Sequence, residues 1–360
     1  MANIVTDYFL ELLRTYSPTG REDKIAGVVE SQLRSLGYEN VHLDRAGNVL
    51  GSFIGNGAKV LLCGHMDTVP GKRPVTFRNG LFTGRGAVDA KASLLALMVG
   101  ASEAKRMGAK LAITFVSAVG EEGESKGIRE VIKNNPHPNY AIFGEPSNTV
   151  DLTVGYKGRI LLEMVVSTLP HHASAPWQGA NAIEKSVDIF RKVERYYGKG
   201  ESFREVSVSL TGMTSKKAHN VTAYYARSLI DLRYPPSKTE GGVMGELRGL
   251  VNSESDKCDV KLKAISSVKP YVSNIRGNLV KSFQAGVAKF SGNTPSLLFK
   301  SGSGDMNIAG NEINVETVTY GPGDPSLSHS DNEVISIKDL ENSIKIVTNA
   351  LIELDSLNPS

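Results

Sequence analysis

The sequence predicts an α/β protein in which a mainly parallel sheet is sandwiched by helices and a second domain is inserted into the chain. Strand-like and helix-like segments alternate along residues 40–107, and this alternation resumes after residue 278. Between these regions the expected order changes to β-α-β-β-α-β, which is typical of a ferredoxin-like unit. The expected division is a first domain over residues 1–157 and 268–360, with the inserted domain over residues 158–267.

The spacing of apolar residues places the elements of the first domain. Gly37 can end the second helix, and Ser336 with Asp339 forms a capping box that begins the last helix. Its expected helices cover residues 6–15, 22–36, 92–107, 279–290 and the segment from Ser336 onward. Its expected strands cover residues 40–43, 49–54, 59–63, 111–119, 140–143, 297–299 and 316–319.

The inserted domain is expected to contain four strands and two helices. The strands are predicted over residues 159–167, 203–210, 221–232 and 259–265. The helices are predicted over residues 181–197 and 239–251. About a hundred residues is an ordinary size for one domain.

Composition excludes several classes of protein. The net charge is only +3 and no long basic run occurs, so no nucleic-acid partner is expected. No apolar segment is long enough to cross a bilayer and the amino terminus does not resemble a signal peptide, so we expect no membrane association and a cytoplasmic location. Cys63 and Cys258 are far apart, which argues against a disulfide framework or a thiolate zinc site.

Potential metal ligands follow the ends of apolar runs. His65, Glu121 with Glu122, and Glu145 each come after such a run, and buried parallel strands deliver their last side chains to one crevice. Asp89 and His329 add a carboxylate and an imidazole. Two divalent metals about 3.5–4 Å apart need one bridging carboxylate and further carboxylate and imidazole ligands on each side.

This set of ligands predicts a role for each residue. His65 and Glu145 would bind one metal, Glu122 and His329 would bind the other, and Asp89 would bridge the two ions. Asp67 would accept the second N–H of the His65 imidazole. Glu121 would be the general base that takes a proton from metal-bound water.

Each of these residues also has an ordinary structural explanation. His65 and His329 could be satisfied core or surface histidines, and Glu121 with Glu122 could be a solvated pair. Asp89 could simply cap the helix that follows it. Only their joint occurrence favours a metal site.

The motifs resemble those of the dinuclear zinc hydrolases that include aminoacylase, glutamate carboxypeptidase, acetylornithine deacetylase and succinyl-diaminopimelate desuccinylase. The matching segments are residues 64–70, 84–91, 121–122, 144–146 and 329–333. The resemblance implies a zinc-peptidase-like catalytic domain, two Zn²⁺ or Co²⁺ ions, and an inserted lid domain that forms a homodimer.

The same resemblance suggests residues of the inserted domain that act on the substrate. His172 matches a histidine that crosses from the partner subunit to stabilise the oxyanion, although His171 competes for this role. Asn220 and Arg233 match residues near the substrate carboxylate, although an arginine at a strand end is often only a surface ion pair. Ser303 and Gly304 lie in a glycine-rich segment that could approach that carboxylate, or could be a flexible loop.

The closest resemblance is to archaeal and thermophile enzymes that release lysine or ornithine from the terminal glutamate of an acidic amino-group carrier protein. A glutamate at position 145 favours deacylation, and the mild basic charge suits an acidic protein substrate. The alternatives are a small-molecule deacylase that acts on N-acetylornithine or succinyl-diaminopimelate, a dipeptidase or carboxypeptidase, and an inactive binding protein. The sequence does not place the acidic residues that would receive the substrate ammonium group, although Glu124, Asp305 and Glu333 lie near the motifs.

Overall fold

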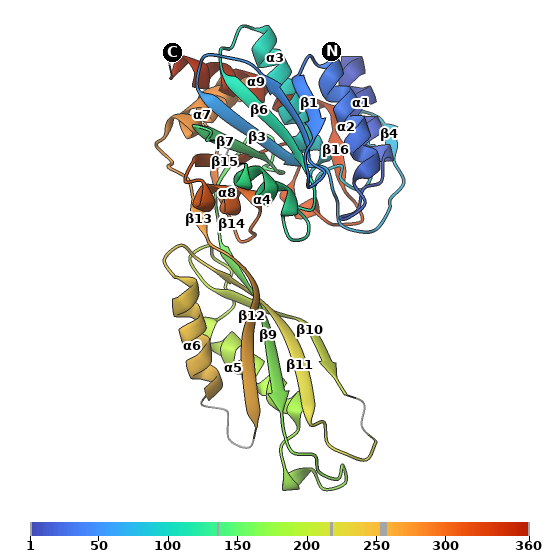
Figure 1. The fold of residues 1–360 in the computed structure, drawn as a ribbon, viewed down its shortest axis with the longest axis vertical. Helices are drawn as coiled ribbons and strands as arrows, with labels where there is room; N and C mark the ends of the chain where they lie inside the picture. Colours follow the sequence, from blue (N-terminus) through green and yellow to red (C-terminus); the bar gives the residue numbers. More distant parts are fainter. Residues whose placement is uncertain (1, 135–136, 217–218, 253–257, 359–360) are drawn as a thin grey trace. The chain divides into compact units, whose positions relative to one another are not determined.

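The chain divides into two compact units. The computed structural model describes residues 2–134, 137–216, 219–252 and 258–358. Unit 1 comprises Met1–Gly155, Ser273–Leu298 and Gly304–Ser360, and unit 2 comprises Tyr156–Val272 and Phe299–Ser303 (Figure 1). Unit 2 therefore includes a short segment, residues 299–303, that the division expected from sequence assigned to the first domain.

Unit 1 is built on a sheet with helices on both faces. Its helices are α1 (Ala2–Arg14), α2 (Asp23–Ser35), α3 (Lys91–Arg106), α4 (Lys126–Lys133), α7 (Asn278–Ser291), α8 (Asp305–Glu312) and α9 (Ile337–Ser356). Its main strands are β1 (Glu39–Leu43), β2 (Val49–Phe53), β3 (Lys59–His65), β6 (Ala112–Ala118), β7 (Tyr140–Gly144), β8 (Leu152–Tyr156) and β15 (Glu316–Tyr320). Figure 1 shows α3, α7 and α9 behind this sheet and α4 and α8 in front of its lower part.

The order of the strands brings four chain segments to one edge of the sheet. Along the sheet the order is β1-β2-β6-β3-β7-β15-β8, and β6, β3, β7 and β15 are mutually parallel. Parallel strands are buried on both faces, and β3 is accordingly buried from Val60 to His65. The carboxyl ends of these four strands meet at the same edge, which is where ligand crevices form in α/β sheets.

The core of unit 1 lies between the sheet and its helices. Helix α3 is buried along most of its length and packs against both β3 and α9. At Gly100 an added Cβ would lie 2.6 Å from Val347, so only glycine permits this close approach of α3 to α9. None of the described helices is both long and apolar enough to cross a membrane.

Unit 2 has the ferredoxin-like order expected from the sequence. Its elements are β9 (Gly158–Ser167), η1 (Pro176–Gln178), α5 (Ala182–Tyr197), β10 (Ser207–Ser215), β11 (Tyr225–Tyr234), α6 (Glu240–Asn252) and β12 (Asp259–Val268). The antiparallel sheet has the order β10-β11-β9-β12, and alternate residues of β9 and β11 are buried. This alternation places one face of the sheet against α5 and α6 and leaves the other face more exposed.

The remaining elements are short. A small separate sheet consists of β4 (Thr76–Arg78), β5 (Leu81–Thr83) and β16 (Val334–Ser336), and η2 covers Pro325–Leu327. Strands β13 (Tyr271–Val272) and β14 (Leu297–Lys300) lie where the chain passes between the units.

Most expected elements are present within a few residues of their predicted limits. Gly37 follows α2 with a φ of +84°, and the Ser336 hydroxyl accepts the backbone N–H of Asp339 at 2.9 Å, so both predicted helix ends are confirmed. Two strands are displaced. Strand β10 begins at Ser207 instead of residue 203, because Ser202 and Glu205 form a hydrogen-bonded turn, and β11 begins at Tyr225 instead of residue 221. Helices α4 and α8, strands β8 and β13, and the small sheet are additional to the sequence prediction.

Candidate functional site

The predicted ligands of unit 1 converge at the carboxyl edge of its parallel strands. His65 is the last residue of β3, Glu121 and Glu122 lie in the turn after β6, and Glu145 directly follows β7. Because these strands are neighbours in the sheet, their ends deliver the three sets of side chains to one place. The sequence pattern of apolar runs followed by polar residues is thus explained.

Asp89 lies between the two histidines. Its Oδ1 is 3.3 Å from Nε2 of His65, and its Oδ2 is 3.3 Å from Nε2 of His329. Nε2 of His329 is also 2.8 Å from Oε1 of Glu122. One carboxylate that presents each oxygen to a different imidazole has the arrangement required of a bridging ligand. Asp89 does not cap α3, whose N-cap residue is Ala90 and has no side-chain hydrogen bond.

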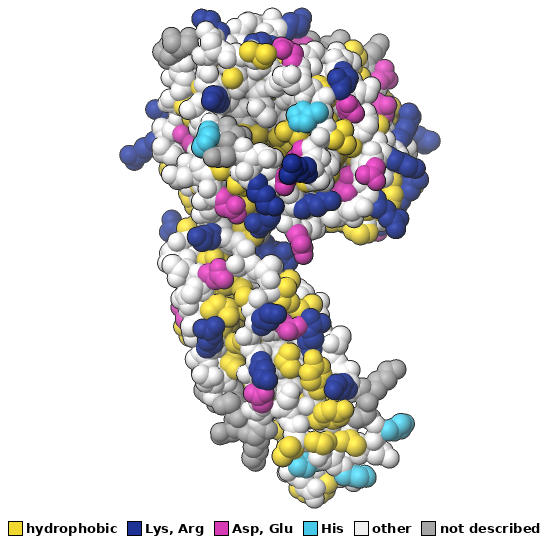
Figure 2. Space-filling view, viewed as in Figure 1, with side chains coloured by type: hydrophobic (Ala, Val, Ile, Leu, Met, Phe, Trp, Pro, Cys, Tyr) yellow, Lys and Arg dark blue, Asp and Glu magenta, His cyan; other side chains and the backbone are white. Residues whose placement is uncertain are grey.

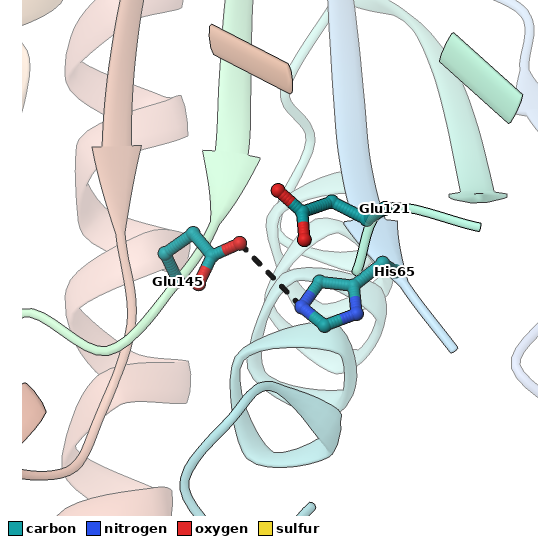
Figure 3. Close-up of side chains that lie close together, drawn as sticks. All are labelled: His65, Glu121 and Glu145. Atoms are coloured by element: carbon teal, nitrogen blue, oxygen red, sulfur yellow. Dashed lines mark ion pairs between the residues drawn. The ribbon is translucent and has the colours of Figure 1, made fainter. Parts of the chain in front are cut away.

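A second group surrounds the other side of His65. Nε2 of His65 is 3.4 Å from Oε1 of Glu145, and one ligand atom from each of His65, Glu121 and Glu145 lies within 4.8 Å of the others. Figure 3 shows the carboxylates of Glu121 and Glu145 directed toward the imidazole of His65. His65, Asp89 and Glu122 form a similar group. Both adjacent glutamates are therefore within reach of a metal position.

The pKa shifts reveal the excess of negative charge. Burial alone would lower the pKa of His65, but its interactions with Asp67, Asp89 and Glu145 outweigh burial and raise the pKa well above its usual value. Asp89 and Glu122 raise the pKa of His329 to about 10. Burial, followed by the neighbouring charge of Glu145, raises the pKa of Glu121. The carboxylate-rich cluster thus favours the charged form of both histidines, whereas burial is the main cause of the shift of Glu121.

The residues of this cluster fit a pair of divalent metal ions. Among the described residues, Nε2 of the buried His65 has no hydrogen-bond partner, although an imidazole nitrogen at this depth is normally paired. Imidazole nitrogens and carboxylate oxygens are ligands that Zn²⁺ and Co²⁺ accept, and bound cations would neutralise the excess negative charge. The chemistry of the donor set and the orphaned nitrogen thus both favour metal binding.

Asp67 supports the site through more contacts than the sequence predicted. The backbone carbonyl of Asp67 is 2.9 Å from Nδ1 of His65, whereas its carboxylate Oδ1 is 3.5 Å away. The carboxylate also accepts the backbone N–H groups of Glu121 and Glu122 at 3.1 and 3.2 Å, and the hydroxyl of Thr19 at 2.8 Å. The backbone oxygen is therefore the nearer acceptor for the imidazole, and the carboxylate mainly holds the turn that carries both glutamates.

Two predicted substrate-binding residues meet within unit 2. Nη1 of Arg233 donates to the Ser303 hydroxyl at 3.0 Å, and its Nε donates to Asp231 at 2.5 Å. Asp231 also pairs with Arg159 at 2.8 Å. Arg233 thus forms the ion pair that is common for an arginine at a strand end. One end of its guanidinium group also contacts Ser303 of the glycine-rich segment.

Gly304 belongs to unit 1 and approaches the predicted general base. A Cβ added at Gly304 would lie 2.9 Å from Oε1 of Glu121. Gly304 is the N-cap of α8, and its backbone N–H donates to Asn307 at 3.1 Å. This residue is therefore part of an ordered helix start rather than of a flexible loop.

His172 and Asn220 lie together in unit 2. A β-bridge pairs His172 with Val221, and the carbonyl of Asn220 accepts the backbone N–H of Ala173 at 2.9 Å. Nδ1 of the exposed His172 accepts the backbone N–H of Ser174 at 3.2 Å, so the neutral imidazole carries its proton on Nε2. The ring of His171 instead packs against Gly179, where an added Cβ would lie 1.8 Å from its Nε2. His172 is the freer of the two histidines.

Several contributing residues were not given a role from sequence. Thr19 binds Asp67, and Arg85 binds the buried Glu333, which is 3% exposed. Burial raises the pKa of Asp305 to about 7, and among the described residues its Oδ1 has no hydrogen-bond partner. Arg85 and Glu333 lie inside the motifs, so their closeness in sequence to predicted ligands could have indicated a supporting role. No local sequence pattern indicates such a role for Thr19.

Comparisons with known proteins agree with this geometry. The model of peptidase family M20/M25/M40 matches residues 61–353. A protein of Sulfurisphaera tokodaii named LysW-lysine/LysW-ornithine hydrolase is 32% identical over 97% of this chain and 95% of its own length. A protein of the same name from Saccharolobus islandicus is 29% identical over 97% of this chain and 95% of its own length.

Solved structures share the fold across the whole chain. A tripeptidase from Staphylococcus aureus has a TM-score of 0.84 at 20% identity, with 99% of each chain covered. An M20 family metallo-carboxypeptidase from Sulfolobus solfataricus has a TM-score of 0.81 at 16% identity, with 98% of this chain and 99% of that chain covered. Because the family model matches most of the chain and the relatives are similar over nearly their full length, this chain belongs to peptidase family M20/M25/M40 and is a hydrolase.

Proposed function

We propose that this hydrolase releases lysine or ornithine from the terminal glutamate of an acidic amino-group carrier protein. The position of Asp89 between His65 and His329 supports hydrolysis at a dinuclear metal centre. The near full-length similarity to a LysW-lysine/LysW-ornithine hydrolase supports the choice of substrate. A role in lysine or arginine biosynthesis would place the enzyme in the cytoplasm.

The two ions, which we propose to be Zn²⁺ or Co²⁺, would be held by His65, Glu145, Glu122, His329 and the bridging Asp89. When bound, such ions polarise an amide carbonyl and lower the pKa of water. The protein fixes the ligands in advance: Asp67 holds His65 and the turn of the glutamates. Fixed ligands reduce the reorganisation needed when substrate binds.

Glu121 would move the proton. Its carboxylate faces His65 and Glu145 and is adjacent in sequence to the ligand Glu122. As the water oxygen bonds to the amide carbon, Glu121 would accept the water proton and then donate it to the amine nitrogen when the C–N bond breaks. The products would be the carrier with a free glutamate side chain and the free amino acid.

A second copy of the chain would complete the site. His172 and Asn220 adjoin the amino end of β11, whereas Arg233 lies near its carboxyl end. A strand of this length spans roughly 30 Å, so these residues of one unit 2 cannot contact the same small substrate. We therefore assign His172 and Asn220 to the site of a partner subunit, with Nε2–H of His172 donating to the oxyanion.

Exposed apolar side chains support this homodimer. In the same region as His172, Trp177 is 80% exposed and Leu169 is 76% exposed. Figure 2 shows apolar and histidine side chains gathered at the lower end of the region that unit 2 occupies. Large apolar side chains exposed together are typical of interaction surfaces.

Arg233, Ser303 and Gly304 would recognise the carboxylate of the substrate. A guanidinium group offers donors in a planar fork that matches a carboxylate, and a glycine allows close approach of the backbone. Arg233 already contacts Ser303, which places the charge beside this segment.

A panel of substrates tests the proposal. Purified enzyme with Zn²⁺ or Co²⁺ would be assayed on the lysine and ornithine conjugates of the carrier, on N-acetylornithine, on succinyl-diaminopimelate and on dipeptides. The carrier conjugates should give the highest kcat/KM. Preference for either acylated small molecule would establish a deacylase instead, and preference for dipeptides would establish a peptidase.

A further inference from the structure

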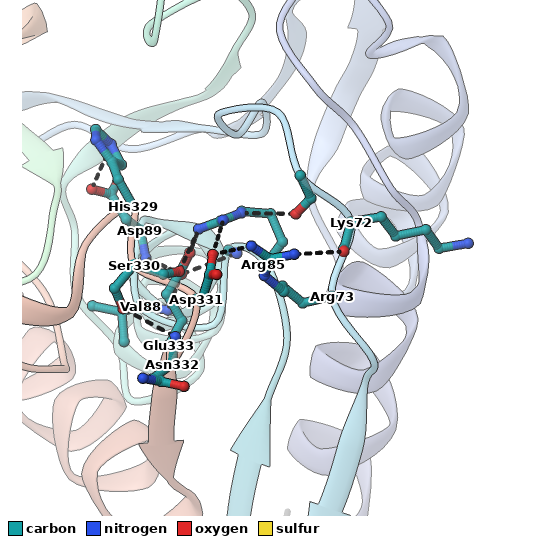
Figure 4. A network of polar contacts seen from close by, with 12 residues as sticks. Lys72, Arg73, Arg85, Val88, Asp89, His329, Ser330, Asp331, Asn332 and Glu333 are labelled. Atoms are coloured by element: carbon teal, nitrogen blue, oxygen red, sulfur yellow. Dashed lines mark hydrogen bonds and ion pairs between the residues drawn. The ribbon is translucent and has the colours of Figure 1, made fainter.

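Glu333 is a buried carboxylate whose two oxygens both accept hydrogen bonds. It is 3% exposed, and its Oε1 accepts Nη1 of Arg85 at 2.5 Å. Its Oε2 accepts the backbone N–H groups of Gly86, Val88 and Asp89 at 3.0, 3.0 and 3.2 Å. Figure 4 shows this network beside Asp89 and His329. Glu333 therefore has no free oxygen to receive a substrate ammonium group.

These bonds fix the backbone that carries the bridging carboxylate. The N–H of Asp89 itself donates to Glu333, and the two oxygens of Asp89 then face His65 and His329. Since both ions would depend on Asp89, a small displacement of its backbone would alter both metal positions.

Arg85 extends the same network to the loop of the other histidine. Its Nη1 also donates to the carbonyl of Ser330 at 2.8 Å, and Ser330 directly follows His329. His329 has a φ of +63°, a conformation that a histidine adopts only when its surroundings hold it. Nε of Arg85 donates to the carbonyl of Gly71 at 3.2 Å. The pair thus joins segments that are more than 240 positions apart in the sequence.

A buried ion pair of this kind needs a reason beyond stability. Removing two charges from water costs free energy that their attraction often fails to repay, so buried pairs are weak evidence of stabilisation. Here every additional hydrogen bond of the pair goes to backbone next to a predicted metal ligand or to a neighbouring loop, and Arg85 also makes an ion pair of 3.9 Å with Asp331, two positions after His329. The arrangement is suited to fixing ligand positions.

We propose that Glu333, together with Arg85, is a positioning residue that sets the bridging Asp89 and His329 for metal binding. This inference rests on the ligand set of the proposed function. Glu333 is not one of the proposed ligands, and it would act through the backbone of residues 86–89 and through Arg85.

The test compares Glu333→Gln with a matched control. A glutamine must direct its NH₂ group toward either Arg85 or the three backbone N–H groups, so one set of donors loses its acceptor. Glu316→Gln is the control, because Glu316 also accepts a backbone N–H, from Leu279 at 3.1 Å, but lies at the opposite end of β15 from the site. Zn²⁺ affinity would be measured by competition with a chromophoric chelator, and ions per chain by elemental analysis.

Glu333→Gln should weaken the binding of at least one ion by about 10–100-fold, as is typical for residues that orient ligands. The rise in Tm on adding Zn²⁺ should also shrink. Glu316→Gln should lose stability equally with and without Zn²⁺ and keep wild-type affinity. Wild-type affinity for both ions in Glu333→Gln would overturn the inference, because a purely structural residue behaves in that way.

Arg85→Lys keeps the inference testable if Glu333→Gln does not fold. This variant retains the positive charge beside Glu333 but loses the planar fork that also reaches Ser330. Weaker Zn²⁺ binding is expected, and unchanged binding of both ions would contradict the role of the pair. If the wild-type enzyme itself binds fewer than two ions, the ligand set is wrong and the proposed function fails first.

Discussion

The functional residues of unit 1 and those of unit 2 are held in different ways. In unit 1, Asp67 and Glu333 each make several hydrogen bonds that fix the residues around the predicted metals. In unit 2, the ring of the exposed His172 contacts Ser174 of its own loop, and Arg233 has one contact with Ser303 beyond its ion pair. Ligands held by several hydrogen bonds suit metal binding, which needs a fixed geometry, whereas exposed residues suit recognition of a particular substrate.

Replacing Glu121 should have the largest effect on turnover. Glu121→Gln removes the group that would accept the water proton, so kcat should fall by about 10³–10⁴-fold with two ions still bound. Glu130→Gln is the control, since Glu130 is a carboxylate of the nearby helix α4 that pairs with Lys133. Steady-state kinetics with elemental analysis would measure both quantities. Substantial residual activity in Glu121→Gln would move the proton-transfer role to another residue.

Removing His329 should affect metal binding most. Nε2 of His329 faces both Asp89 and Glu122. His329→Ala should therefore lower the affinity for one ion by at least about 100-fold, while the second ion keeps the higher affinity of the two. His171→Ala provides a histidine control in unit 2. If His329→Ala retained two tightly bound ions, unit 1 would not contain the proposed ligand set.

Replacing His172 tests whether unit 2 acts on the site of a second chain. His172→Ala should lower kcat by about 10²-fold, the usual cost of losing one oxyanion donor, without changing metal content. Mixed with Glu121→Gln and allowed to exchange subunits, it should recover about a quarter of wild-type activity, because half of the dimers then contain one complete site. No recovery despite subunit exchange would place His172 in the site of its own chain.

Arg233 should give the smallest of these effects, and it should appear in substrate binding. Arg233→Met removes one charged hydrogen bond to the substrate carboxylate, so KM should rise by about tenfold with little change in kcat. Arg159→Met is the control, because Arg159 pairs with the same Asp231. If the two variants raised KM equally, Arg233 would act only by pairing with Asp231 and would not bind the substrate.

The periodic parts of the fold were predictable, and irregular parts were not. Continuous apolar runs predicted β3 and β7, since strands buried on both faces have no polar alternation. The helix α8 was missed because its eight residues include asparagine and glycine and show little periodicity. The displaced start of β10 depends on the hydrogen bonds of the turn between Ser202 and Glu205, which apolar spacing does not report.

The candidate site divides in the same manner. His65, Glu122 and Glu145 were predicted because short local motifs place them at strand ends. The pairing of Arg85 with Glu333 joins positions 248 apart, and no local pattern specifies such a partner. The preference of His65 for the backbone oxygen of Asp67 depends on atomic distances that residue types alone do not determine.

The most direct test of the metal centre is anomalous X-ray scattering from crystals of the enzyme loaded with Zn²⁺. Two peaks are expected, one beside His65 and Glu145 and the other beside Glu122 and His329, with Asp89 between them. A single peak, or peaks away from these residues, would contradict the proposed dinuclear site.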